Sequence, residues 1–121
     1  MRQAFAHQAV VVMAANGDSR APGAAITVAL CGHWDHEPPC LLSPHHTQAD
    51  RIGGAVHLRT VFAAEPGSED AIRQRIDDAL GGGKLQGPAG VTTHWELRDS
   101  QPSAISTAEK DLAARLIQTE A

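Results

Sequence analysis

A sixteen-residue stretch, CGHWDHEPPCLLSPHH from Cys31 to His46, concentrates the side chains of this chain that bind metal ions most readily. It holds both cysteines and four of the seven histidines. Thiolate sulfur and imidazole nitrogen are the ligands that Zn²⁺ prefers, and structural zinc sites use four of them in a tetrahedron. The sequence therefore predicts a metal-binding protein. Zinc is the expected ion, with iron and copper as alternatives because the same ligand types suit them.

The stretch offers more candidate ligands than one tetrahedral site uses. The expected ligands are Cys31, His36, Cys40 and one of His45 or His46, with His33 in reserve. Asp35 and Glu37 are expected to accept hydrogen bonds from a ligand imidazole and so to orient it. Prolines before Cys40 and before His45 restrict the backbone and lower the entropy lost on binding. The spacing matches no zinc-finger pattern, so the prediction depends on residue chemistry alone.

Two other interpretations of the stretch stay open. Cys31 and Cys40 could form a disulfide in a non-metal interaction domain, or the residues could lie unligated on the surface. A disulfide that closes so short a loop contributes about 2.5–3 kcal/mol. A structural zinc site contributes on the order of 10 kcal/mol in apparent binding free energy. A reducing compartment also disfavours the disulfide, so the metal is the preferred interpretation.

The chemistry of the predicted site depends on how many protein ligands it has. Four ligands make a closed structural site, whereas three ligands and a water make an open one. An open site could support a metal-dependent hydrolase, with Asp35, Glu37 or a spare histidine as general base. Surplus ligands also fit metal sensing, carriage or storage. A metal-free cysteine–histidine nucleophile lacks an accompanying oxyanion motif in this sequence. The sequence predicts metal binding and leaves the reaction open.

Composition narrows the class of protein. At 121 residues with 42% hydrophobic residues, the chain is expected to form one domain, 1–121, with a sizeable core. A net charge of −4 and 3% aromatic residues argue against a nucleic-acid binder. No run approaches the ~20 apolar residues that cross a membrane. The N-terminal apolar run is interrupted by His7 and Gln8 and is typical of a strand, so we expect a cytoplasmic protein. The abundance of Ala, Arg and Gly indicates a high-GC bacterial source.

The elements expected to position the stretch are four strands and two helices. Apolar alternation predicts strands over 7–14, 24–31, 55–64 and 91–98. Ile72, Ile76 and Leu80 recur at helical spacing after a possible cap at Ser68, and glycines from Gly81 stop the helix. A capping box from Ser106 to Glu109 predicts a closing helix. The order β-β-β-α-β-α indicates an α+β two-layer sandwich with a mostly antiparallel four-stranded sheet.

Strand alternation also predicts which face each histidine occupies. A lone histidine is usually a surface residue or a satisfied core residue, and this is the expectation for His7, His57 and His94. If the helices cover the apolar face, however, Cys31, His57 and His94 share the other face, where the histidines would be additional ligands. That face is partly apolar, so a homodimer through it is expected.

Overall fold

The computed structural model describes residues 2–31, 44–87 and 90–118, and it confirms an antiparallel α+β fold. The described part of the chain holds five strands and three α-helices rather than the expected four and two. The elements are β1 Gln3–Met13, α1 Ala21–Cys31, β2 His45–Ile52, β3 Ala55–Ala64, α2 Glu69–Gly81, β4 Lys84–Gln86, β5 Thr92–Ser103 and α3 Lys110–Gln118. Short 3₁₀ turns precede α2 and α3, at Pro66–Ser68 and Thr107–Glu109.

The sheet has the strand order β2-β3-β1-β5-β4, and every pair is antiparallel. Without the short strand β4, the chain order is β-α-β-β-α-β with β1 and β3 in the middle. This is the ferredoxin-like arrangement. It places the end of α1 and the start of β2 at the outer edge of the sheet, next to β3.

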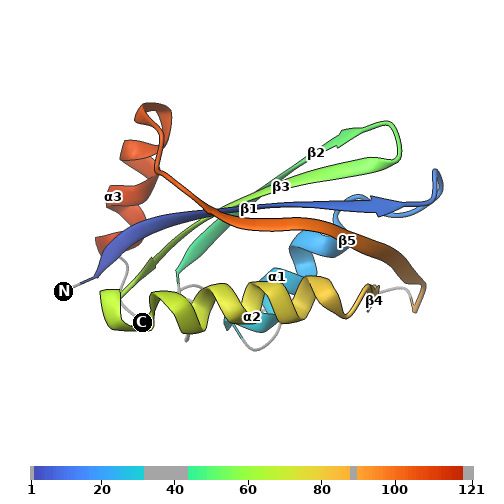
Figure 1. The fold of residues 1–121 in the computed structure, drawn as a ribbon, viewed down its shortest axis with the longest axis horizontal. Coiled ribbons are helices and arrows are strands. Elements are labelled where there is room, and N and C mark those ends of the chain that lie inside the picture. The colour runs from blue at the N-terminus through green and yellow to red at the C-terminus, as the bar shows by residue number, and fades with distance from the viewer. Residues whose placement is uncertain (1, 32–43, 88–89, 119–121) are drawn as a thin grey trace.

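Helices cover both faces of the sheet, which differs from the expected arrangement. Helices α1 and α2 lie side by side on one face, whereas α3 lies on the opposite face and covers only one end (Figure 1). The main core lies between the sheet and α1 and α2, and its largest fully buried side chains include Ile26, Leu30, Phe62, Ile76 and Leu80. We call the face that carries α3 the open face, because none of the described helices lies above its other end.

Residues 24–31 are the last eight of the eleven residues of helix α1, so the strand predicted for them is wrong. The alternation was ambiguous, because residues four apart share a face both in a strand and in a helix. Ile26 and Leu30 are both buried, whereas Val28, two residues from each, is only half-buried. Alanines favour the helix, and Pro22 in its first turn is compatible with it.

Strand β2 was missed because its sequence, HHTQADRI, is mostly polar and has no apolar alternation. It is an edge strand that pairs only with β3 among the described strands, and polar side chains are common at such edges. Strand β4, which lies between α2 and β5 in the chain, was not among the four predicted strands. Gly83 turns the chain from α2 into β4 at a φ of 71°, where a Cβ atom would lie 2.8 Å from the carbonyl oxygen of Trp95.

A bulge in β5 decides which of its residues face the helices. Val10 pairs with Asp99 and Val11 pairs with Leu97, so Arg98 is the extra residue. Before the bulge, Thr93 and Trp95 are buried on the α2 side, and the Trp95 indole donates to the Leu80 carbonyl over 2.9 Å. Beyond the bulge the alternation is reversed, so even-numbered positions face α2 and odd-numbered positions face away.

Arg59 fastens the C-terminal segment to the open face. Its guanidinium donates to both carboxylate oxygens of Glu109, over 2.6 and 2.8 Å. It also donates to the Ser103 hydroxyl over 2.9 Å and to the Ala104 carbonyl over 2.7 Å. Glu109 in turn accepts from the Ser106 backbone over 2.9 Å, as the predicted capping box requires. These contacts place α3 on β1 and β3.

We predict that Glu109→Gln destabilises the protein by about 2 kcal/mol, the usual range for a charge-assisted hydrogen-bonded pair. The Arg59 guanidinium lowers the pKa of Glu109 to about 2 from its ordinary value of 4.5. The stabilisation that ionised Glu109 gives the folded state is therefore complete above about pH 4.5 and is lost as the pH falls towards 2. Urea unfolding as a function of pH should show that acid lowers the free energy of unfolding less in the variant than in the wild-type protein.

Glu96→Gln provides the matched control, since Glu96 belongs to an exposed ion pair with Arg98 at 3.4 Å. Such pairs contribute little, so a change below about 0.5 kcal/mol is expected. Equal stability losses in the two variants would contradict the role given to Glu109.

Candidate functional site

The structure describes only the two ends of the predicted metal-binding stretch. Cys31 is the last residue of α1, and His45 and His46 are the first two residues of β2. The other predicted ligands and orienting residues lie outside the described residues: His33, Asp35, His36, Glu37 and Cys40. Helix α1 and strand β2 are in contact with each other. The fold therefore brings the two ends of the stretch together at one edge of the sheet.

The two adjacent histidines lie on opposite sides of β2. His45 pairs with Phe62 of the main core, and its Nε2 atom lies 3.2 Å from the hydroxyl of Thr27. His46 pairs with Val61 on the other face and is exposed. Thr27 precedes Cys31 by four residues, which is about one turn of α1. Of the two histidines, His45 is the one that shares the α1 side of the sheet.

A shallow cavity of about 490 Å³ lies between α1 and β2, beside this pair of chain ends. Its lining residues are Arg20, Gly23, Thr27, His45, His46, Thr47 and Ala49. Arg20 forms an ion pair with Asp18 at 3.0 Å at the exposed rim. Because most of the lining is polar and uncharged, the cavity suits water or a small polar ligand.

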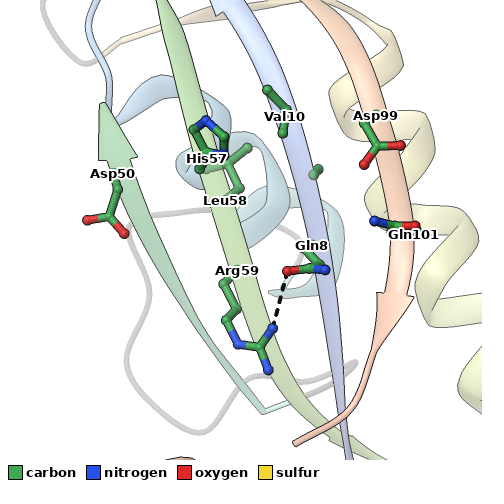
Figure 2. Close-up of a pocket in the computed structure, with 9 residues that line it drawn as sticks. Gln8, Val10, Asp50, His57, Leu58, Arg59, Asp99 and Gln101 are labelled. Carbon is green, nitrogen blue, oxygen red and sulfur yellow. Dashed lines mark hydrogen bonds between the residues drawn. The ribbon is translucent and has the colours of Figure 1, made fainter. Parts of the chain in front are cut away.

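A second hollow lies on the open face, across the central strands (Figure 2). It measures about 340 Å³ and is lined by Gln8, Ala9, Val10, Asp50, His57, Leu58, Arg59, Asp99 and Gln101. Asp50, His57, Val10 and Asp99 form one row across four strands. Arg59 contacts Gln8 and Glu109, so its charge is neutralised at the end of the hollow nearest α3. The surface expected for a homodimer is thus reduced to the part of this face that α3 leaves uncovered.

Two of the three residues suggested to share a face do so, since His57 and His94 both lie on the open face. His57 is exposed in β3, and His94 is exposed in β5, opposite Lys84 of β4 and in alternation with buried residues on the α2 side. Cys31 ends α1, which covers the other face, because residues 24–31 are helical rather than extended. Within residues 2–31, 44–87 and 90–118, no three His, Cys, Asp or Glu side chains are grouped so that they could hold a metal ion.

A polar network that the sequence did not reveal joins three elements in the interior. His7 of β1 is 3% exposed, and its Nε2 atom lies 2.7 Å from the hydroxyl of Ser100 on β5. Its Nδ1 atom lies 3.0 Å from a guanidinium nitrogen of Arg73 on α2. Ser100 donates to the carboxylate of Asp77, also on α2. His7 is thus a satisfied core histidine, which agrees with the expectation for a lone histidine.

The network contains serine, histidine and aspartate, but its hydrogen bonds run in the wrong direction for nucleophilic catalysis. A guanidinium can only donate, so His7 Nδ1 accepts from Arg73 and Nε2 carries the proton. Nε2 then donates to Ser100, whose own proton goes to Asp77. A catalytic histidine must instead accept the proton of the hydroxyl. The network therefore links the sheet to α2 and has a structural role.

The sequence did not indicate which residues form this network, because its members lie far apart in the chain. His7 is separated from Arg73 by 66 residues and from Ser100 by 93 residues. Ser100 faces α2 only because the β5 bulge reverses the alternation there. A histidine inside an apolar strand was the one visible hint.

Helices in the described ranges are too short, or too polar, for any of them to be a membrane span. No protein-family model matches this chain, and no curated protein matches it either. Among solved structures, the chain is similar to the crystal structure of a hydantoinase/carbamoylase family amidase from Burkholderia ambifaria, with a TM-score of 0.41 and 10% sequence identity. The alignment covers 94% of this chain and 32% of that one, so this chain spans about a third of the amidase.

Proposed function

We propose that this protein binds a transition metal, with zinc as the preferred ion, at the junction of α1 and β2. The observation that carries the proposal is the juxtaposition of the two ends of the cysteine- and histidine-rich stretch, marked by the 3.2 Å contact between Thr27 and His45. Cys31 and His45 are the proposed ligands at the two ends. His36 and Cys40 of the intervening stretch complete the proposed set, and iron and copper are the alternative metals.

Two physical features support a cation at this place. The C-terminal end of a helix carries a partial negative charge, and α1 ends at Cys31 without a basic residue in its last turn. The contact with Thr27 also restricts the imidazole of His45 before any metal arrives. Restriction of a ligand in this way reduces the entropy lost on binding.

The position of His45 supports it over His46 as the proposed ligand, a choice that the sequence left open. His45 lies on the same side of the sheet as α1, whereas His46 lies on the opposite side. A single metal bound beside the end of α1 is therefore better served by His45. Thr27 would then act as the partner that orients this ligand, a role usually conserved in metal sites of this kind.

The cavity between α1 and β2 favours a second possibility, an open coordination position. His45 and Thr27 line this cavity, so a water or a small molecule could reach a metal bound there. An open position would make the site catalytic or exchangeable rather than purely structural. Spectroscopy of the cobalt-substituted protein distinguishes the two, because coordination by a solvent molecule changes when an anion such as azide is added.

We predict that protein purified without a histidine tag or chelator contains about one equivalent of zinc. Both thiols should react with a thiol reagent only after the metal is chelated, because metal-bound thiolates are protected. Elemental analysis and thiol counting on one sample test this. Zinc-free protein with two freely reacting thiols would contradict the proposal. Zinc-free protein with no reactive thiol would instead support the Cys31–Cys40 disulfide.

We predict that His45→Ala weakens zinc binding by at least about 100-fold, whereas His46→Ala changes it by less than about threefold. The two variants are matched, since they remove the same side chain from adjacent positions that face opposite ways. Thr27→Val keeps the side-chain shape, removes the hydroxyl and should cost about tenfold. Competition with a chromophoric chelator gives the affinities. Equal losses for His45→Ala and His46→Ala would refute the assignment.

A further inference from the structure

We propose that His7 is a proton-sensitive latch that holds the first half of α2 on the sheet, and that protonation at its Nδ1 atom releases Arg73. The proposal is independent of the metal site. It rests on the hydrogen-bond geometry between β1, α2 and β5 described above.

Neutral His7 forms a hydrogen bond at each of its two ring nitrogens, with Ser100 at Nε2 and with Arg73 at Nδ1. Its Nδ1 lone pair accepts from Arg73, which also donates to the Ala6 carbonyl over 2.7 Å and to Glu69 over 2.8 Å. The Arg73 guanidinium lies over the rings of Phe5 and Phe62, at 5.9 and 5.3 Å from their centroids. Arg73 is itself buried, so its position depends on these acceptors. One imidazole lone pair thus helps to keep a buried cation in place.

A proton on Nδ1 makes the Arg73 contact impossible. Two donors and two positive charges would then face each other at 3.0 Å in the interior, where water screens them little. The imidazolium gains a partner at the other end of the network, since Asp77 lies 3.5 Å from Nε2. The positions of the two α2 residues fix the outcome of this conflict: Asp77 retains His7, and Arg73, one helical turn earlier, moves away.

The charged groups around the imidazole set the pH range of the latch. Burial is the largest influence and lowers the pKa of His7 below its ordinary value of 6.5. Asp77 on α2 and Asp99 on β5 raise this pKa, whereas Arg73 on α2 lowers it. The pKa of His7 is lower in the folded protein than in the unfolded chain, so the stabilisation that neutral His7 provides is complete above about pH 6.5. It is lost as the pH falls through the folded pKa.

Hydrogen exchange measured by mass spectrometry tests the proposal, after correction for the intrinsic pH dependence of exchange. Between about pH 7.5 and pH 5, the amides in the first half of α2 should lose protection at least about tenfold, because protonation of His7 removes a contact that holds this part of the helix on the sheet. Amides in β3 should change less. In His7→Gln this region should be less protected at pH 7.5 and should show no further loss at pH 5.

His57→Gln is the matched control, because it removes an exposed imidazole on the open face. It should retain the wild-type pH dependence. If His7→Gln does not fold, an NMR titration of the His7 ring in the wild-type protein tests the proposal. The His7 ring should titrate below pH 6.5 and carry its neutral proton on Nε2. A ring that titrates at or above 6.5, a proton on Nδ1, or an unchanged pH dependence in His7→Gln would overturn the proposal.

Discussion

Strand β1 is the constraint on which the rest of the structure depends. It pairs along most of its length with β3 on one side and with β5 on the other. Because its side chains alternate between faces, neighbouring residues serve different layers. His7 faces α2, whereas Gln8 lines the hollow on the open face. Both helical layers and the polar network are positioned relative to this one strand.

Two arginines fasten helical segments to opposite faces of the sheet. Arg73 joins α2 to β1 through the Ala6 carbonyl and His7, and Arg59 joins β3 to Glu109 at the start of α3. Both use several donors of one planar group, which fixes orientation as well as distance. Helix α3 has nine residues, too few for a stable isolated helix, so its packing and this clamp must hold it. A core with few aromatic residues is thus supplemented by directional polar contacts.

The proposed metal site and the proposed latch meet at one residue of the core. Phe62 pairs with His45 in the sheet, and the guanidinium of Arg73 lies over its ring. The two proposals nevertheless make separate demands on the molecule. The metal site requires soft ligands gathered where α1 and β2 meet. The latch requires only that His7 be buried with Arg73 on its Nδ1 side. Each can therefore fail without the other.

The sequence by itself determined the elements whose periodicity is unambiguous: β1, β3, β5, α2, and the capping box before α3. It also identified the stretch from Cys31 to His46 as rich in candidate metal ligands, since ligand type is a property of single residues. Only the tertiary structure decided that residues 24–31 are helical, because a spacing of four satisfies a strand and a helix alike. It alone placed the polar strand β2 beside β3 and turned His45, rather than His46, towards α1. Strand pairing and the β5 bulge set these orientations, and both depend on partners distant in the chain, which local patterns do not encode.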